Sequence, residues 1–343
     1  MAKAERLPSG NYRVRVYVGS SMVDGKRVRR YETFTGPDKR DVELQAAQFS
    51  AANTGRTDDI TFGKALAGYI AAKENVLSPS TVLGYKRMER NHFNEIKNKR
   101  LSRITQKDVQ AMINTCAIRL SPKSCQNIHG LFSAVMRMYA PERSFYTKLP
   151  QREKKEVFIP SADDIRAIAE CLKGNKLELP FMLATQLGLR ASEIAGLTKN
   201  CVDKKKKTIT IKQAMVESEG GTAIKAPKSY SGYRVLRCND ALLNRVLSSP
   251  IGTGGTIGMT AHHISMYWNR EIDKIPVAHF GFHKLRHYFA SQAMLQGVPL
   301  RYLAELMGHT GTQMLEQVYL HTFPSEKEKY SAQMADFFAE NIE

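Results

Sequence analysis

The spacing of the apolar residues changes near residue 60, and this change limits the folds that the chain can adopt. In NYRVRVYVG, apolar residues that begin with Tyr12 and Val14 alternate with polar ones, which is the period of two of a β-strand. After a turn at Asp24 and Gly25, KRVRRYETF predicts a further strand, and residues 38–53 predict a helix. We therefore expect a small three-stranded sheet with one helix at the N-terminus.

Helix-start signals dominate the sequence that follows. Ser-Pro pairs at 78–79 and 121–122 place a capping side chain directly before the residue type that is preferred at the first helical position. Thr105 and Ser161 are each followed three residues later by an aspartate, a spacing that lets the two side chains cap a helix reciprocally. Residues 61–143 are therefore expected to form four helices, and a further helix begins at Ser161.

The last part of the chain has a mixed pattern. KKKKTITIKQA and GYRVLRC predict strands between long helices, and IKAPKSYSGYRVLRC predicts a hairpin whose turn region contains Lys225, Lys228 and Gly232. The predicted fold is a multidomain α+β protein, with a sheet and helix at 1–58, a helical domain at 59–143, a linker at 144–158, and a mixed, mainly helical domain with a small antiparallel sheet at 159–343.

The charge favours a polyanionic partner. The 343 residues carry a formal net charge of +18, and each phosphate that Lys or Arg neutralises releases condensed counterions. Residues 61–143 contain 14 basic and 5 acidic side chains, so we expect this segment to clamp nucleic acid. Arginines on the N-terminal strands fit the same role, although a solvated sheet face would also carry such charges. The predicted DNA contacts are Arg13, Arg15, Arg27, Arg29, Arg30, Lys86, Arg87, Arg90 and Lys123.

The same composition argues against several other classes. The five cysteines are scattered and form no C-x-x-C or Cys/His cluster, so neither a disulfide framework nor a zinc site is expected, and the protein is expected to be cytoplasmic. The sequence has no long apolar run and no basic amphipathic anchor, so a membrane is not an expected partner. The opening MAKAERLPSG lacks the apolar region of a signal peptide.

The stretch HKLRHYFASQAML combines a core pattern with basic groups. Its spacing predicts a helix with one buried side. His283 and Arg286 are three residues apart and therefore share a face near the start of this helix. The residues predicted to form the buried side are Leu285, Tyr288, Phe289, Ala293 and Leu295.

Two further stretches place polar residues in apolar surroundings. In TQLGLRASEIAGL, Arg190 must be paired or bind an anion because a lone buried charge is costly, and a pair with Glu193 would be sufficient. In ELMGHTGTQMLEQVYLHT, Gly308 and His309 end a helix, and Tyr319 follows ten residues after the histidine. A tyrosine in an apolar segment is more often a packing residue than a catalyst, so each observation is weak alone.

As an ordered set, these residues resemble the tyrosine recombinase family (the phage integrases). The stretches GLRASEI, HKLRHYFAS and LMGHT match the family's motifs, and the layout is similar to integrases with an arm-binding, a SAM-like core-binding and a catalytic domain. Tyr288 stands where the family commonly has Thr. Lys228 takes the place of the lysine in the family's Pro-Lys-Thr turn, with Lys225 as the alternative. The catalytic residues that the resemblance implies are Arg190, Lys228, His283, Arg286, His309 and Tyr319.

The resemblance implies site-specific DNA recombination with no cofactor and no metal. Tyr319 would be the nucleophile of a 3′-phosphotyrosine intermediate, His283 the base, and Lys228 the general acid for the leaving 5′ hydroxyl. Arg190 and Arg286 suit the scissile phosphate because a guanidinium group donates two parallel hydrogen bonds to it.

Other residues receive supporting roles. Glu193 is expected to orient Arg190, and His287 and His321 are expected to be structural or peripheral. The apolar residues near the C-terminus fall on one side of a helix, which either folds onto its own domain or, as the family implies, docks on a neighbouring subunit of a homotetramer.

The expected setting is a bacterial nucleoid, where the enzyme integrates or excises a phage or mobile element at double-stranded DNA recombination sites. Accessory DNA-bending or excision factors are further partners that the resemblance implies. A type IB topoisomerase-like relaxing enzyme and a non-catalytic DNA-binding regulator are the alternative functions.

Overall fold

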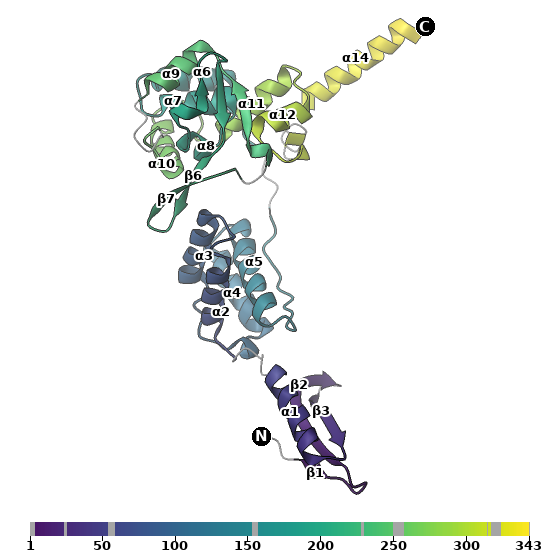
Figure 1. The fold of residues 1–343 in the computed structure, drawn as a ribbon. Helices are drawn as coiled ribbons and strands as arrows, with labels where there is room; N and C mark the ends of the chain where they lie inside the picture. The colour runs from purple at the N-terminus through teal and green to yellow at the C-terminus, as the bar shows by residue number, and fades with distance from the viewer. Residues whose placement is uncertain are drawn as a thin grey trace. The chain divides into compact units, whose positions relative to one another are not determined.

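The computed structural model describes most of the chain, and Figure 1 shows its elements. The chain divides into two compact units, Met1–Lys73 with Tyr85–Gln151, and Glu74–Gly84 with Arg152–Glu343. None of the described helices has both the length and the hydropathy that crossing a membrane requires. The predicted three-domain division stays a prediction. The described residues are 4–23, 26–53, 59–152, 157–227, 230–249, 257–313, 315–316 and 324–342.

The N-terminal sheet has three strands, as predicted. They pair antiparallel in the order β1-β2-β3. Val14 is buried against Val42 and Ala46 of the following helix, and Tyr12 and Val16 border this small core. The alternation in the sequence therefore reports correctly which face of the strand is covered. The elements are β1 (Glu5–Arg6), β2 (Tyr12–Val23), β3 (Lys26–Gly36) and α1 (Lys39–Asn53).

Four helices follow, as the capping signals predict. Thr105 accepts a hydrogen bond from the Asp108 backbone N–H, and the Asp108 carboxylate accepts one from the Thr105 N–H. The rings of Phe93 and Phe132 pack on either side of Phe62, with centroid distances of 5.1 and 5.4 Å. The helices are α2 (Phe62–Lys73), α3 (Pro79–His92), α4 (Gln106–Arg119) and α5 (Pro122–Tyr139), with a 3-10 turn at Leu101–Arg103.

The second unit is mixed and mainly helical, so the predicted fold class is confirmed. Ser161 and Asp164 form the expected reciprocal cap at its first helix. The described strands form a three-stranded antiparallel sheet in the order β4-β5-β8 and a two-stranded β6-β7 sheet. The elements are α6 (Ala162–Cys171), α7 (Glu178–Leu187), α8 (Ala191–Ala195), β4 (Val202–Asp203), β5 (Thr208–Ile211), β6 (Ala214–Ser218), β7 (Gly221–Lys225), β8 (Arg234–Arg237), α9 (Asp240–Ser248), α10 (Ala261–Ile272), α11 (Lys284–Leu295), α12 (Leu300–Met307) and α14 (Pro324–Ile342), with 3-10 turns at Lys199–Cys201 and Tyr230–Gly232.

The predicted hairpin in IKAPKSYSGYRVLRC is wrong. β7 pairs with β6, with Lys225 opposite Ala214, whereas β8 pairs with β5, with Arg234 opposite Ile211. The reason is that alternation within a strand does not specify which strand is its partner. The tight turn instead joins β6 to β7 at Glu219 and Gly220, and Gly220 has a φ of 80°.

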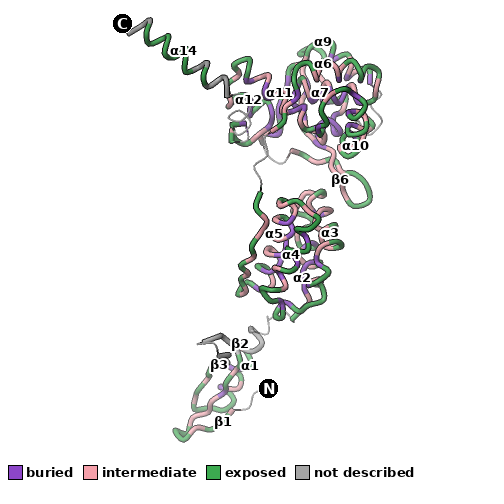
Figure 2. The backbone as a smooth tube through the Cα atoms, turned by 180° about the vertical axis from the view of Figure 1, so that it is seen from behind, coloured by how far each residue is buried: buried purple, intermediate pink, exposed green. Residues whose placement is uncertain are grey.

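Helix α11 connects two hydrophobic cores, and this connection positions the residues at its start. Leu285 belongs to a core built around Trp268, whose indole N–H donates to the Phe280 carbonyl at 2.6 Å. Further along the helix, Ala290 and Met294 belong to a second core that they share with α12. Figure 2 shows the buried residues, in purple, in α11 and its neighbours.

The buried side of α11 differs from the predicted one. Leu295 is 47% exposed, whereas Arg286 is only 2% exposed. The buried face therefore follows Arg286, Ala290 and Met294 at intervals of four. An arginine can occupy this face because backbone carbonyls inside the unit accept its hydrogen bonds.

Candidate active site

Residues that are far apart in the sequence line one cavity of about 780 Å³ in the second unit. Arg190 lies at the start of α8, His283 and Arg286 lie at the start of α11, and His309 lies in the turn after α12. Four of the six predicted catalytic residues are thus found together. The other lining residues are His287, Met307, Gly308, Thr310, Gly311, Thr312, Gln313 and Leu315.

Arg190 is held at the junction between α7 and α8. Helix α7 ends at Gly188, which has a φ of 63°, and a Cβ there would lie 2.5 Å from Cδ1 of Phe289. The Arg190 backbone N–H donates to Oε2 of Glu193 at 3.0 Å, and Nη1 of Arg190 donates to Oε1 at 2.7 Å. Glu193 therefore contacts both the backbone and the side chain of Arg190, as an orienting residue should.

Arg286 is enclosed by backbone carbonyls and by one imidazole ring. Its guanidinium group donates to the carbonyls of Gly188 and Met307, and Nη2 lies 2.7 Å from Nε2 of His309. Because a guanidinium group offers only donors, Nε2 accepts, and a neutral His309 carries its proton on Nδ1. The same arginine lies 4.0 Å from the Glu193 carboxylate.

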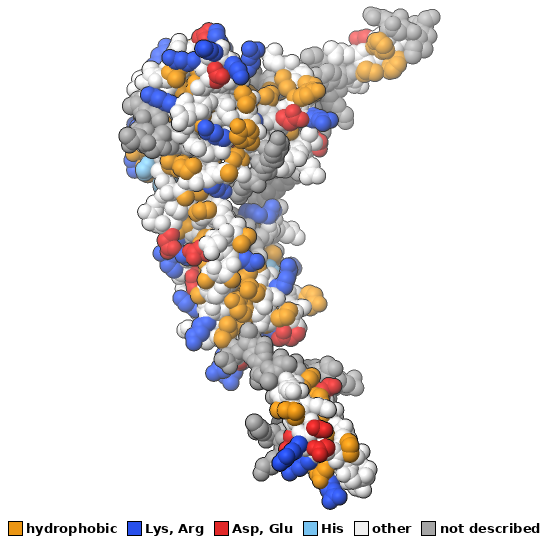
Figure 3. All heavy atoms as spheres, in the orientation of Figure 1, with side chains coloured by type: hydrophobic (Ala, Val, Ile, Leu, Met, Phe, Trp, Pro, Cys, Tyr) orange, Lys and Arg blue, Asp and Glu red, His pale blue; other side chains and the backbone are white. Residues whose placement is uncertain are grey.

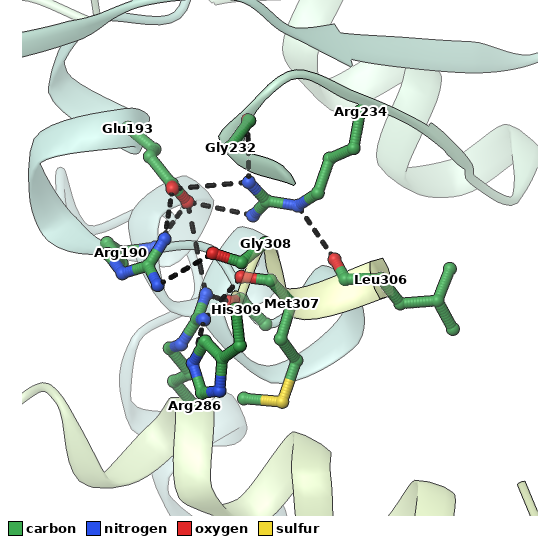
Figure 4. A network of polar contacts seen from close by, with 10 residues as sticks. Arg190, Glu193, Gly232, Arg234, Arg286, Leu306, Met307, Gly308 and His309 are labelled. Carbon is green, nitrogen blue, oxygen red and sulfur yellow. Dashed lines mark hydrogen bonds and ion pairs between the residues drawn. The ribbon is translucent and has the colours of Figure 1, made fainter. Parts of the chain in front are cut away.

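Three arginines of the site donate hydrogen bonds to backbone carbonyls at the end of α12. The last carbonyl groups of a helix lack intrahelical partners and carry partial negative charge, so cationic donors are favoured there. Three consecutive carbonyls each accept from a different arginine, as Figure 4 shows: Leu306 from Arg234 Nε at 2.7 Å, Met307 from Arg286 Nη2, and Gly308 from Arg190 Nη2 at 3.2 Å.

Arg234 is the member of this network that the sequence reasoning missed. It is 7% exposed, and its Nη1 and Nη2 donate to the two carboxylate oxygens of Glu193 at 3.2 and 2.9 Å. A usable signal exists in RVLR, the residues of β8. Arg234 and Leu236 alternate with the exposed Val235 and Arg237, which places the first arginine on the buried face of the strand.

The arginines keep the central carboxylate charged. Burial alone would raise the pKa of Glu193, but the hydrogen bonds and charge of Arg234, and then those of Arg190, lower this pKa to about 2. Burial lowers the pKa of Arg286 to about 9, and the charge of Arg190 adds to the effect, so Arg286 is still protonated at neutral pH. One carboxylate thus faces three guanidinium groups, and the wall of the cavity keeps a net positive charge.

The cavity histidines are largely uncharged at neutral pH. Burial, followed by the charge of Arg286, lowers the pKa of His309 to about 4. Burial and the neighbouring His283 lower the pKa of His287 to about 4. Partial burial, then Arg286 and Arg190, lowers the pKa of His283. The His283 ring is edge-on to His287 at a centroid distance of 5.2 Å, and His283 is exposed and lines the cavity, so it can accept a proton there.

Other predicted residues cannot be placed in the cavity. Lys228, Tyr319 and His321 lie outside the described residues. The alternative lysine, Lys225, donates to Oγ of Ser78 at 2.7 Å within the same compact unit. In the part of the chain that the structure describes, no group of three or more His, Cys, Asp and Glu side chains is arranged to hold a metal ion.

The predicted DNA contacts all belong to the first unit, whereas the cavity residues belong to the second. Figure 3 shows Lys and Arg side chains, in blue, on the visible face of the helices of this unit. Arg13 forms an ion pair with Glu5 at 3.0 Å, so part of its charge is neutralised locally. The side chains of Arg27, Arg29 and Arg30 lie outside the described part. Those that are exposed or half-buried are Arg13, Arg15, Lys86, Arg87, Arg90 and Lys123.

Replacing Glu193 by Gln should destabilise the protein by about 3–5 kcal/mol, because Arg190, Arg234 and Arg286 would lose the charge that compensates them. Since the pKa of Glu193 falls from an ordinary 4.5 to about 2 on folding, its contribution is fully present above about pH 4.5 and is lost between there and about pH 2. The stability difference between the two proteins should therefore narrow over this interval.

Urea unfolding of both proteins at about pH 7 and about pH 3 measures this change. Glu170→Gln is the matched control, because the side chain of Glu170 is 69% exposed and should show a small effect at either pH. A Glu193→Gln penalty that does not change with pH would contradict the assignment.

Comparison with known proteins agrees with this geometry. The model of the phage integrase family matches residues 161–326, and that of the phage integrase N-terminal SAM-like domain matches residues 61–117. A protein described as tyrosine recombinase XerC-like, from Caldanaerobacter subterraneus subsp. tengcongensis, is 26% identical, with 95% of this chain and 96% of the relative covered. The integrase of Salmonella phage P22 is 25% identical, with 57% and 51% covered.

Solved structures show the same fold. The Tn1549 transposon integrase, in complex with circular intermediate DNA, is similar, with a TM-score of 0.68 and 18% identity. The match covers 80% of this chain and 100% of the Tn1549 chain. A lambda integrase tetramer bound to a Holliday junction has a TM-score of 0.57 and 16% identity, covering 92% and 94%. The matched domains, the fold and the cavity lead to one conclusion: the chain belongs to the phage integrase family and is a tyrosine-type site-specific recombinase.

Proposed function

We propose that the cavity binds the scissile phosphodiester of a DNA recombination site and that Tyr319 attacks its phosphorus. The bond to the 5′ oxygen breaks, which leaves a 3′-phosphotyrosine and a free 5′ hydroxyl. A 5′ hydroxyl of a partner strand then attacks the same phosphorus and releases the phenol, so the strands are rejoined without ATP. The observation that carries this proposal is the convergence of Arg190 and Arg286 on one cavity wall.

The two arginines suit the transition state. A pentavalent phosphorus spreads negative charge over its non-bridging oxygens, and fixed cations stabilise that charge more than they stabilise the ground state. The hydrogen bonds of Arg190 and Arg286 to backbone carbonyls hold both guanidinium groups before the substrate arrives. The side chain of Arg190 remains 35% exposed and therefore open to an anion.

His309 contributes a donor once the phosphate is present. In the described structure its Nε2 accepts from Arg286, and its Nδ1 is buried without a hydrogen-bond partner among the described residues. An anion beside a histidine raises the pKa of the imidazole. A phosphate oxygen that takes the Arg286 hydrogen bond would thus also favour a proton on Nε2.

His283 is the base for the tyrosine. A phenol with a pKa of about 10 must lose its proton as it attacks, and a neutral imidazole accepts it. Burial, and then the charges of Arg286 and Arg190, lower the pKa of His283 and keep the ring neutral, and the residue lines the cavity.

Lys228 is the proposed general acid for the leaving 5′ oxygen. The hydrogen bond that Lys225 makes to Ser78 supports this choice, because an ammonium group that already has a fixed acceptor is less suited to transfer a proton to the substrate.

The proposed substrate is double-stranded DNA. The net charge of +18 favours it, and the Tn1549 and lambda integrases were solved with DNA. We assign arm-type sites to the sheet and helix at 1–58, core sites to the helical domain at 59–143, and strand exchange to 159–343. We further propose that accessory DNA-bending or excision factors take part, and that the enzyme acts at the bacterial nucleoid.

Assembly is proposed to use helix α14. The described side chains from 331 to 339 are all exposed, and they include Met334, Phe337 and Phe338 at 51%, 54% and 48%. The orange side chains near the C-terminal end in Figure 3 show this apolar side. Exposed apolar surface of this kind marks a docking site, and the tetramer of lambda integrase supports a neighbouring subunit as the partner.

Tyr319→Phe should abolish the covalent protein–DNA adduct on a nicked suicide substrate, because the phenolic oxygen is the atom that bonds to phosphorus. Tyr302→Phe is the matched control: it removes a hydroxyl from an α12 tyrosine that is 59% exposed and should leave adduct formation unchanged. Denaturing electrophoresis measures the adduct. Adduct that persists in Tyr319→Phe would show that Tyr319 is not the nucleophile. In a separate assay with supercoiled circular DNA that carries recombination sites, relaxed circles without recombinant products would favour a topoisomerase.

A substrate with sulfur in place of the leaving 5′ oxygen distinguishes the two lysines. A thiolate leaves without a proton because thiols have a pKa of about 8.5. Lys228→Met should cleave the oxygen substrate about 10²–10⁴-fold more slowly and regain most of the rate on the sulfur substrate. Lys225→Met should behave like the wild type on both. If Lys225→Met, rather than Lys228→Met, is slow on the oxygen substrate and regains its rate on the sulfur substrate, Lys225 is the general acid.

Deletion of residues 326–343 should leave DNA binding unchanged and strongly reduce recombination, because the docking helix is lost. The double variant Phe337→Ser, Phe338→Ser should reproduce the defect, whereas Asp336→Ser, on the same helix, should not. Gel-shift titration and a two-site recombination assay measure the two properties. Recombination at the wild-type level by the truncated protein would show that α14 serves only its own subunit.

A further inference from the structure

We propose that Arg234 is a positioning residue of the recombinase: it holds Glu193 and the end of α12 in one arrangement, and through them it sets where Arg190 and His309 meet the scissile phosphate. This inference rests on the proposed function of the cavity. It concerns a residue that lies outside the cavity wall and that the sequence motifs do not include.

The first step is the bond between Arg234 and Glu193. The two terminal nitrogens of Arg234 reach one carboxylate oxygen each, at 3.2 and 2.9 Å, which is the fork geometry that fixes the plane of a carboxylate. The same carboxylate orients Arg190, whose Nη1 donates to Oε1 at 2.7 Å. The position of Arg190 therefore depends on Arg234 through a shared acceptor.

The second step is the bond between Arg234 and α12. Nε donates to the Leu306 carbonyl at 2.7 Å, one and two residues before the carbonyls that accept from Arg286 and Arg190. Gly308 then turns the chain with a φ of 65°, and a Cβ at this residue would lie 2.8 Å from Nη1 of Arg234. The close fit of arginine and glycine fixes the path of the chain that leads directly into His309.

The third step excludes direct contact with the substrate. The side chain of Arg234 is 6% exposed, and four hydrogen bonds occupy its donors: two to Glu193, one to Leu306 and one to the Gly232 carbonyl at 3.3 Å. A guanidinium group has five N–H donors, so nearly all are used within the protein. Arg234 can act on the reaction only through the groups that it holds.

A merely stabilising arginine and a positioning arginine predict different kinetics. If Arg234 only stabilises the fold, its replacement lowers the fraction of active protein, and the molecules that remain folded cleave at the normal rate. If it positions the site, the cleavage rate constant falls although DNA is bound normally, because misplaced groups lose transition-state contacts. Single-turnover cleavage separates these cases, since its amplitude reports the active fraction and its rate constant reports the chemistry.

The experiment uses the full chain, a nicked suicide substrate at saturating concentration, and three variants. Arg234→Met should reduce the rate constant by about 10²–10³-fold, comparable to the loss of one transition-state donor, with a DNA Kd within about threefold of wild type. Arg234→Lys keeps the charge beside Glu193 and so protects the fold, but it lacks the fork and should be about tenfold slower. Arg237→Met changes the exposed arginine of the same strand and should match the wild type.

The outcomes are distinguishable. A reduced amplitude with a wild-type rate constant in both Arg234 variants overturns the proposal, as does wild-type behaviour of Arg234→Lys if Arg234→Met fails to fold. Weaker DNA binding with an unchanged rate constant also overturns it. Absence of any covalent adduct with the wild-type protein contradicts the proposed function itself.

Discussion

The structure of the site depends on one interaction: the unpaired carbonyls at the end of α12 accept hydrogen bonds from arginines that arrive on three other elements. Arg190 comes from the start of α8, Arg234 from β8, and Arg286 from α11. Packing three guanidinium groups together is electrostatically unfavourable, and the carboxylate of Glu193 and the negative end of the helix offset the repulsion. The fold and the charge distribution of the cavity are therefore established by the same contacts.

This arrangement gives the cavity a fixed positive charge, which is what the proposed binding of a phosphodiester requires. Arginine charges in water would be screened and mobile, whereas these are partly desolvated and bound to carbonyls of the backbone. Burial, and then the charge of these arginines, lowers the pKa of His283 and of His309, which keeps one imidazole ready to accept a proton. The proposed acid–base capacity and the proposed phosphate recognition thus depend on one cluster of side chains.

Features that local sequence determines could be predicted, and features that depend on distant partners could not. The reciprocal caps at Thr105 and Ser161 and the alternation around Val14 involve neighbours in sequence, so their patterns are sufficient. The pairing of β8 with β5 depends on which strand is near in space, and alternation carries no such information. The alternation in β8 places Arg234 on the buried face, but it does not identify the partners Glu193 and Leu306, which lie 41 and 72 residues away.

The exposed position of Leu295 has the same cause and shows how chemistry and packing compete within α11. Hydrophobicity alone would turn Leu295 inward, but the helix can bury only one face, and that face includes Arg286. Burying an arginine is tolerated because Gly188 and Met307 supply carbonyl acceptors that no apolar side chain could use. The rotation of α11 between its two cores is therefore set by hydrogen bonds at its first turn. Packing further along the helix, at Ala290 and Met294, fits the same rotation, which leaves the Arg286 guanidinium group at the cavity.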